Sequence, residues 1–369
     1  MVIPITNNCI TQIKDDNMNK LTALKERHTI SEAMTCSTVL RVKDKVIVTE
    51  EFKCLANIKM VDRMMVSLAR SKGPLFTVKD FPKKEGQYAH QTDLGREFLT
   101  CFSIDFEIIK QIYPDNIFSP YFSLFEQHIS DLNLGYGRLL PEQVPGLNKL
   151  VDQIRGEAIS DGFTKVLANH ERASKKNGRS LVVYLDAIRK SYSKLLVVRL
   201  DLHYGKHFVN PQDDLGCVTR AEAKRHREEF IKHLKKCYPV VGYVWKTERG
   251  AIKSFHHHFL LMFNGQNLRA DETIGMRLGE HWVREITRGI GTYWNCNAKK
   301  GEYSNLAIGT IHHDDNVTWA LLNQIAMYLT KIDMYVKDNA PEHDRCFGKG
   351  TIPKTEGKRK GRPRVKVAA

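Results

Sequence analysis

The chain has 369 residues, a length that predicts about two domains. It carries 57 Lys and Arg against 42 Asp and Glu, a formal net charge of +15. That excess favours a polyanionic partner, with nucleic acid ahead of a membrane surface. The longest apolar runs, such as residues 259–263, are far shorter than the roughly 20 residues of a membrane-spanning helix, so a membrane protein is excluded.

The cysteine pattern and the N-terminus indicate the compartment. The eight cysteines are scattered and form no CxxC pair, which predicts reduced thiols instead of a disulfide framework or a zinc ribbon. Residues 1–8 show no basic stretch followed by an apolar one, so no signal peptide is expected. We therefore expect a cytoplasmic protein.

Residues 1–145 are expected to form a mostly helical N-terminal region. Apolar residues recur there at spacings of three, four and three, which predicts an amphipathic helix through Ile58, Val61, Met65 and Leu68. Aromatic residues are dense between positions 98 and 130, and such density is typical of a packed core. A segment punctuated by Gly and Pro at 134–146 marks the expected boundary.

Residues 146–192 are predicted to be a helical connector. Helices are expected over 147–170 and 179–192, separated by the polar segment 174–178. Residues 193–340 are predicted to form the next domain, and residues 341–369 a basic tail.

Within 193–340 the predicted order is β-α-β-β-α-β followed by one more helix. The four strands are expected at 195–202, 240–245, 255–263 and 306–311. The first helix is opened by a capping box of Thr219 and Glu222. The last helix is expected to be capped by Asp315 or Asn316 and to run to about Lys337. This order predicts an α+β fold with a ferredoxin-like antiparallel sheet and an appended helix.

Three consecutive histidines lie inside the third predicted strand. Side chains alternate across a strand, so His256 and His258 are expected on one face and His257 on the other. Histidines amid apolar neighbours are costly to bury without partners, which favours a metal or catalytic role over a structural one. Glu248, across the predicted hairpin, could complete a ligand set suited to Mg²⁺ or Mn²⁺ better than to tetrahedral zinc, or it could be a solvated acid beside the turn.

The last predicted helix carries a second set of candidates. Tyr328, Lys331 and Tyr335 follow one another at spacings of three and four, which predicts that they share a helix face. Tyrosine is a poor nucleophile at its free pKa near 10. It becomes effective when a metal polarises a phosphodiester and an ammonium stabilises the developing charge. The alternative for Tyr328 is a place in the core.

Two further groups have more than one interpretation. Asp201 alternates away from the apolar face of the first strand, so it faces the histidines or has a structural role. The run His312-His313-Asp314-Asp315 could bind a second metal, but its position just before a helix favours capping.

Together, the His256–His258 strand, Glu248 and the helix with Tyr328 and Lys331 resemble the HUH endonucleases. In the rolling-circle replication initiators among these enzymes, the histidines precede the tyrosine along the sequence, as they do here. The flanking segments 199–202 and 242–248 resemble the inovirus-type (YagK/YfjJ C-terminal) branch of these enzymes. The resemblance covers about residues 190–340.

The resemblance implies a set of metal ligands and a reaction. His256 and His258 would bind Mg²⁺ or Mn²⁺, with Glu248 as a less certain third ligand. Tyr328 would attack single-stranded origin DNA, leaving a 5′-phosphotyrosyl enzyme and a free 3′-OH, and the strand would later be rejoined.

The resemblance also implies roles for the remaining helix residues and for partners. Lys331 would stabilise charge at the phosphate. Relatives with two tyrosines usually space them by four, whereas Tyr335 follows Tyr328 by seven, so we favour a single nucleophile. Single-stranded and duplex origin DNA are the expected partners, and a host polymerase would extend the 3′-OH. The chain has no GxxxxGK[ST] loop, so a host helicase is also expected.

The basic tail has two interpretations. Residues 358–366 resemble an AT-hook, in which Arg362 and Arg364 would enter the minor groove of A·T-rich duplex. Otherwise the tail supplies only salt-sensitive attraction to phosphates. For the whole chain, the alternative to a nicking enzyme is a non-catalytic DNA-binding regulator of a mobile element. The histidines and the Tyr328/Lys331 pair favour the enzyme, because binding alone needs neither.

Overall fold

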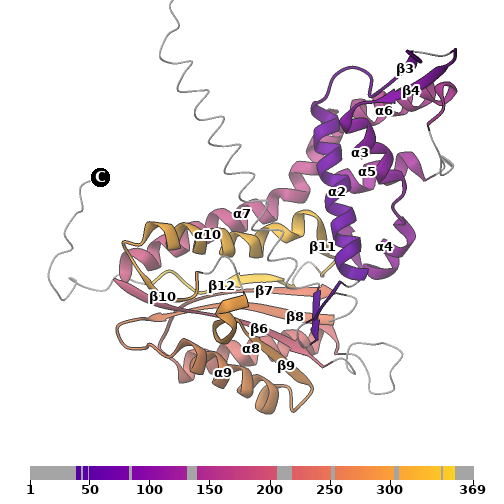
Figure 1. The fold of residues 1–369 in the computed structure, drawn as a ribbon. Helices are drawn as coiled ribbons and strands as arrows, with labels where there is room; N and C mark the ends of the chain where they lie inside the picture. Colours follow the sequence, from indigo (N-terminus) through magenta and orange to yellow (C-terminus); the bar gives the residue numbers. More distant parts are fainter. Residues whose placement is uncertain are drawn as a thin grey trace, which may run out of the picture.

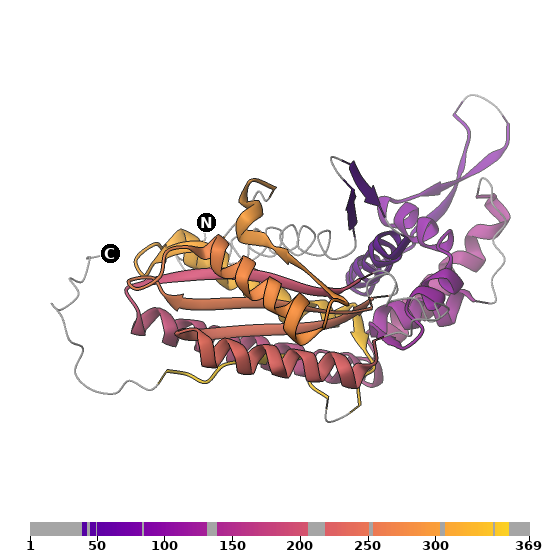
Figure 2. The same ribbon diagram turned by 90° about the horizontal axis from the view of Figure 1, so that it is seen from below.

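The computed structural model describes residues 39–42, 45–48, 50–82, 85–130, 139–205, 218–250, 254–302, 307–341 and 344–353. It is an α+β structure in which a mostly helical N-terminal region lies at one end of a layered domain built on an antiparallel sheet (Figures 1 and 2). Over the described part of the chain, no helix is long and apolar enough to cross a bilayer. None of the cysteines that the structure describes forms a disulfide: Cys54, Cys101, Cys237, Cys296 and Cys346.

The N-terminal region is mostly helical, as the sequence predicts. Its helices are α2 (Glu50–Arg70), α3 (Asp93–Phe102), α4 (Phe106–Ile112), α5 (Pro120–Ile129) and α6 (Val144–Ala158), the last preceded by the 3-10 turn η1 (Pro141–Gln143). Its short strands are β1 (Val39–Val42), β2 (Lys45–Val48), β3 (Phe76–Asp80), β4 (Gln87–Gln91) and β5 (Asn116–Phe118).

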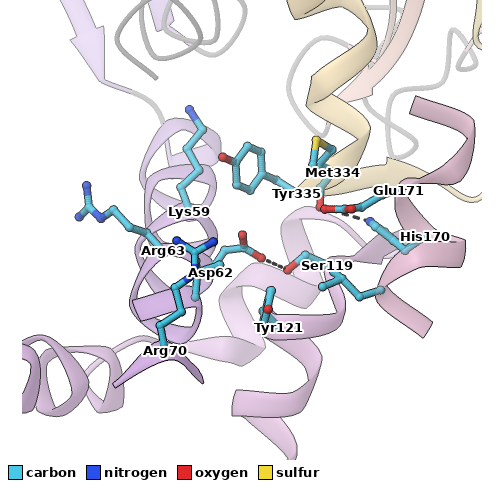
Figure 3. Close-up of a pocket in the computed structure, with 12 residues that line it drawn as sticks. Lys59, Asp62, Arg63, Arg70, Ser119, Tyr121, His170, Glu171, Met334 and Tyr335 are labelled. Carbon is cyan, nitrogen blue, oxygen red and sulfur yellow. Dashed lines mark hydrogen bonds between the residues drawn. The ribbon is translucent and has the colours of Figure 1, made fainter. Parts of the chain in front are cut away.

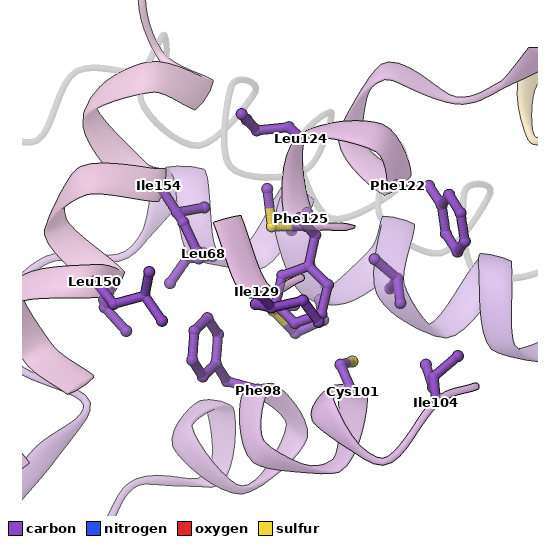
Figure 4. Packing of buried hydrophobic residues seen from close by; sticks show 14 of the residues in the cluster. Leu68, Phe98, Cys101, Ile104, Phe122, Leu124, Phe125, Ile129, Leu150 and Ile154 are labelled. Atoms are coloured by element: carbon purple, nitrogen blue, oxygen red, sulfur yellow. The ribbon is translucent and has the colours of Figure 1, made fainter. Parts of the chain in front are cut away.

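The predicted core of this region is confirmed. The apolar stripe of α2 is fully buried: Ile58, Val61, Met65 and Leu68. It packs against the aromatic cluster, in which Phe98 and Phe125 meet edge to face at 5.6 Å between ring centroids (Figure 4). Edge-to-face pairs add to the stabilisation that burial itself provides.

The central sheet is formed by β6 (Lys194–Tyr204), β7 (Val240–Gly250), β8 (Ser254–Asn264), β9 (Gly291–Asn295), β10 (Gly309–His312) and β12 (Phe347–Lys349). Its strand order is β10-β6-β8-β7-β12, and all neighbours are antiparallel. On the same edge of β6, residues 194–197 pair with β10 and residues 200–204 pair with β9.

Two helical layers cover the sheet (Figure 1). Helices α8 (Arg220–Cys237) and α9 (Asp271–His281) lie on one face, and the π-helical turn η3 (Trp282–Ile286) directly follows α9. On the other lie α7 (Asp161–Ser191) and α10 (Asn316–Lys331). Alternation along β6 explains both layers, because Leu196 and Val198 pack toward α8 and α9, and Leu195 and Val197 toward α7 and α10.

Two predicted helix starts are confirmed. The Thr219 hydroxyl accepts a hydrogen bond from the Glu222 amide, and the Glu222 carboxylate reaches back to the Thr219 amide, so the capping box is formed. At the start of α10, the Asp315 carboxylate accepts from the Thr318 amide at 3.0 Å. Capping is therefore the role that the structure gives to Asp315.

The predicted helix boundaries before the sheet were wrong. The break falls at Ile159–Ser160, where Ser160 caps α7, and the polar segment 174–178 lies inside that helix. The Ser174 hydroxyl donates to the Thr330 carbonyl of α10. A methyl group on Gly178 would lie 2.8 Å from Met327 Cε. Small residues in this segment let two helices approach closely. The same residues, considered without their tertiary contacts, predict a helix break.

The last helix ends earlier than predicted. Helix α10 stops at Lys331 and is followed by the 3-10 turn η5 (Ile332–Met334) and by β11 (Val336–Asp338), which pairs with β5. Tyr335 therefore lies outside α10 and does not share a face of that helix with Tyr328. The extended backbone that pairs with β5 is incompatible with a further helical turn.

Other elements were not predicted. Strands β9 and β12 have five and three residues, too short for a readable alternation. Strand β12 pairs with β7 through residues that the sequence assigns to the basic tail. The C-terminal half of α7 packs on the sheet through Leu181 and Leu185, so the predicted connector contributes to the core of the layered domain. Residues 354–369, with Arg362 and Arg364, lie outside the described residues.

Helix α9 approaches β9 through a glycine, and this contact generates a stability prediction. A methyl group on Gly279 would lie 2.2–2.4 Å from ring carbons of Tyr293, whereas one on Gly156 of α6 would meet nothing within 4 Å. Gly279→Ala should lower the free energy of unfolding by about 1–3 kcal/mol through overpacking. Gly156→Ala should raise it by up to about 1 kcal/mol through helix propensity. Urea unfolding of both variants checks this, and equal effects would contradict the packing of α9 on β9.

Candidate metal centre

The strand register brings three predicted ligands to one face of the sheet. Glu248 on β7 is directly opposite His256 on β8, and His258 is opposite Asp201 on β6. Directly opposed residues of antiparallel strands project to the same face. By this parity Glu248, His256, His258 and Asp201 belong to the face that α7 and α10 cover.

The distances within this triad fit a shared ion. Glu248 Oε2 lies 3.1 Å from His256 Nε2 and 3.4 Å from His258 Nε2. One ligand atom from each residue falls within 4.8 Å of the others. His256 and His258 are each only 3% exposed. Two imidazoles and one carboxylate form a donor set that divalent metal ions use, so the three residues could hold a metal ion.

Unsatisfied polar atoms at the triad support this fit. Glu248 Oε1 is buried and has no hydrogen-bond partner among the described residues. His258 Nε2 is also buried and forms no hydrogen bond with the described residues, although it lies 3.4 Å from Glu248 Oε2. Leaving a buried polar group without a partner costs about 1–3 kcal/mol. A cation coordinated by these atoms would remove that cost.

Asp201 sets the orientation of His258. Asp201 Oδ1 lies 2.8 Å from His258 Nδ1, and Arg199 lies 3.6 Å from the other carboxylate oxygen. A carboxylate on Nδ1 turns the opposite nitrogen, Nε2, toward Glu248, which is the usual outer-shell arrangement of a metal-binding histidine. The sequence left the role of Asp201 open, and the structure places it at the site.

The electrostatics of the site keep its acids ionised. Burial alone would raise the pKa values of Asp201 and Glu248, but the facing imidazoles, with Arg199 beside Asp201, outweigh burial and hold both pKa values well below the usual range. Burial likewise opposes the charged form of His258. The two carboxylates prevail and raise the pKa of His258 to about 9. Without a metal, His258 is therefore an imidazolium at neutral pH.

His257 projects to the opposite face, as strand parity predicts. Its Nδ1 lies 2.9 Å from the Thr247 hydroxyl, which also accepts a hydrogen bond from Arg227 of α8 at 3.1 Å. Burial, reinforced by the Arg227 charge, holds the pKa of His257 well below its ordinary value. The neutral ring is part of the packing between the sheet and α8.

Sequence reasoning missed two groups beside the triad. Lys246 is opposite His258, is 1% exposed, and its Nζ lies 2.5 Å from Asp333 Oδ1 in η5. Burial would lower the pKa of Lys246, but Asp333 raises it and keeps the ammonium charged. His203 on β6 places its ring 5.8 Å from that of His256. The alternation of positions 244, 246 and 248 along the strand could have predicted that Lys246 lies on the same face as Glu248.

The remaining predicted residues fall in different places. Tyr328 and Lys331 lie in the last turns of α10, but their side chains are outside the described part of the structure. Their neighbours Ala326 and Leu329 are buried in the layer between α10 and the sheet. Tyr335 lies against the N-terminal region, with Lys59 Nζ 5.9 Å from its ring centroid.

The raised pKa of His258 predicts a pH-dependent metal affinity. Coordination needs the neutral imidazole, so a metal must displace a proton at any pH below about 9. Affinity for Mn²⁺ should rise about tenfold per pH unit between roughly pH 6.5 and 9 and then level off. Calorimetry in buffers of different ionisation enthalpy measures the released proton. Asp201→Asn removes a negative charge that stabilises the His258 imidazolium, so the Mn²⁺ affinity should reach its plateau at a lower pH. A Mn²⁺ affinity that does not change with pH would contradict the assignment of His258 as a ligand.

Strand parity predicts which substitutions weaken metal binding. His256→Ala or Glu248→Gln should reduce Mn²⁺ affinity by at least about 100-fold, because each removes a ligand. His257→Gln should keep the affinity within a few-fold and lower the stability of the fold by about 1–3 kcal/mol, because Thr247 loses a buried partner. Calorimetric titration with Mn²⁺ and urea unfolding separate the two effects. A folded His257→Gln protein that no longer binds Mn²⁺ would show that the strand geometry is wrong.

Comparison with known proteins places the layered domain in a family. Residues 164–350 match the family model described as the YagK/YfjJ C-terminal domain. No curated protein and no solved structure matches the chain. The matched segment begins in α7 and ends just after β12, so it contains the sheet, both helical layers and the triad. Since the match covers just over half of the residues, the chain belongs to the YagK/YfjJ C-terminal domain family.

Proposed function

We propose that this protein is a metal-dependent DNA-nicking and strand-transfer enzyme of the HUH type that initiates rolling-circle replication. One observation carries the proposal. The triad of Glu248 and the buried His256 and His258 lies on the sheet face that α10 covers, and α10 is the helix that bears Tyr328. A protein that only binds DNA needs neither a buried ligand set nor a tyrosine helix above it.

The topology of the sheet supports the proposed fold. With β9 left aside as an insertion between α9 and β10, the strands β6, β7, β8 and β10 are the four strands of a β-α-β-β-α-β unit, and they lie in the order four-one-three-two. Both crossover helices, α8 and α9, cover the same face. This arrangement is the basis on which we assign a ferredoxin-like sheet with α10 appended to its other face.

The Lys246–Asp333 ion pair supports the placement of the tyrosine helix. It joins the turn that follows α10 to β7, two residues before Glu248. Lys246 is buried and Asp333 is only partly exposed, so loss of Asp333 would leave a buried ammonium without its carboxylate, and the pair holds the turn after α10 at this strand. Tyr328 and Lys331 lie within the last four residues of that helix.

The proposed reaction assigns a task to each group. A bound Mg²⁺ or Mn²⁺ would polarise the scissile phosphate of single-stranded DNA. The Tyr328 hydroxyl loses its proton as its oxygen attacks phosphorus and forms a 5′-phosphotyrosyl bond. The bond from phosphorus to the 3′ oxygen breaks and that oxygen takes up a proton, so that one proton passes overall from the tyrosine to the new 3′-OH. The Lys331 ammonium stabilises charge at the phosphate. Attack by a 3′-OH on the phosphotyrosine reverses these steps and rejoins the strand.

The charge of the chain supports a DNA partner. The net charge of +15 attracts phosphates, both of the single strand that is cut and of the duplex origin. In this proposal a host polymerase extends the free 3′-OH and a host helicase opens the duplex. Arg362 and Arg364 add affinity for duplex without contributing to cleavage.

The nucleophile assignment predicts the behaviour of two tyrosine variants. Tyr328→Phe should abolish the covalent protein–DNA adduct and leave oligonucleotide binding within about twofold, because only the attacking oxygen is lost. Tyr335→Phe should retain the adduct. The measurement is a denaturing gel of protein incubated with labelled origin-strand oligonucleotides, with and without Mn²⁺.

The possible outcomes separate the two candidate functions. An adduct that disappears only in Tyr335→Phe would reassign the nucleophile. If wild-type protein binds the oligonucleotides and Mn²⁺ but forms no adduct with any origin-strand sequence, the nicking proposal fails and a DNA-binding regulator takes its place.

A further inference from the structure

A pocket of about 460 Å³ lies away from the triad, where the N-terminal region meets the layered domain (Figure 3). Its walls come from α2, α5, α7 and the segment just after α10. Its volume falls within the range of about 300–1,000 Å³ that is typical of small-ligand sites. It shares no residue with the triad.

Helix α2 supplies three cations to this pocket, Lys59, Arg63 and Arg70. Among the described residues, neither arginine forms an ion pair with a carboxylate. Glu171 also lines the pocket, but it forms an ion pair with Lys175. Three cations against the one remaining carboxylate, Asp62, leave the charge of the pocket positive, which favours an anionic ligand. Guanidinium groups match phosphate oxygens in geometry.

The inner wall carries a hydrogen-bonded pair of a hydroxyl and a carboxyl group. The Ser119 hydroxyl donates a hydrogen bond to the Asp62 carboxylate. Burial raises the pKa of Asp62 to about 6. At neutral pH, which lies above this pKa, the carboxyl is mostly ionised, so it accepts hydrogen bonds from N–H groups on the polar edge of a ligand.

Two aromatic rings complete the pocket. Tyr121 of α5 and Tyr335, which follows η5, both line it, and Figure 3 shows them on different walls around the Asp62–Ser119 pair. Lys59 Nζ lies 5.9 Å from the Tyr335 ring centroid. Tyrosine faces are stacking platforms for nucleobases. A ligand that interacts with the cations, the polar pair and the tyrosine rings combines a phosphate, a planar ring and polar groups on the edge of that ring.

We propose that this pocket binds a nucleoside monophosphate unit, with its phosphate at the α2 cations and its base against the tyrosines. The unit is either a free nucleotide or one residue of a DNA strand, and the chemistry is the same in both cases. The inference goes beyond the proposed nicking reaction, because it requires no metal and no cleavage.

The test measures binding to the full chain in EDTA. The probes are dAMP, dCMP, dGMP, dTMP and inorganic phosphate, each alone by calorimetry, and a fluorescent ten-residue oligodeoxynucleotide by anisotropy. The variant is Arg63→Ala/Arg70→Ala, in which both exposed cations are removed. The control is Lys53→Ala, an exposed lysine on the same helix that does not line the pocket. Circular dichroism confirms that each variant is folded.

Either of two results supports the proposal. If the pocket takes a free nucleotide, at least one mononucleotide binds at least tenfold more tightly than phosphate, and the double variant weakens it at least tenfold. If it takes a residue of a strand, only the oligonucleotide binds, and the double variant weakens it at least tenfold whereas Lys53→Ala changes it less than twofold.

Three results would overturn it. Inorganic phosphate that binds as well as every nucleotide would leave only an anion site. Equal losses of oligonucleotide affinity in the double variant and in Lys53→Ala would leave only general electrostatic attraction. Absence of binding by every probe would leave no site at all. Because every measurement is made in EDTA, without the metal ion that cleavage requires, the outcome is independent of the nicking proposal.

Discussion

The register between β6, β8 and β7 is the constraint on which the rest of the structure depends. It places Asp201, His258 and Lys246 in one row across the sheet and puts Glu248 opposite His256. Because side chains alternate with a period of two, a slip of one residue would send the triad to the opposite face and bring His257 in its place. The hydrophobic residues of the same strands prevent that slip, since both faces are buried by helices.

Charge inside this layer is tolerated because it is paired. Asp201, His258 and Lys246 are buried and Glu248 is only slightly exposed, and each faces a group of opposite charge. An isolated buried charge would be expelled or neutralised, whereas a connected set can remain ionised. The Lys246–Asp333 pair extends this set from the sheet to the turn after α10. The same electrostatic network thus orders the ligand site and holds the helix that bears Tyr328.

The N-terminal region is joined to the end of that helix. Strand β11 pairs with β5, and the Ser119 amide donates to the Tyr335 carbonyl at 3.0 Å. Leu55 of α2 packs into the cluster formed by α7, α10 and the sheet. A ligand in the pocket beside Tyr335 would therefore contact the chain two residues beyond Asp333. This continuity gives the N-terminal region a physical connection to the proposed catalytic helix.

The sequence by itself determined the features that depend on neighbours in the chain. The His256–His258 alternation, the hairpin with Glu248, the stripe of α2 and the caps at Thr219 and Asp315 all follow from local periodicity or local hydrogen bonds. Tertiary structure decided what depends on residues far apart. Lys246 and Asp333 are separated by 87 positions, and no local pattern connects them. The polar segment of α7 stays helical because α10 packs against Ser174 and Gly178, and α10 ends at Lys331 because the residues after η5 pair with β5. Burial of those distant contacts outweighs local propensity, and it moves Tyr335 from a helix face into the pocket beside α2.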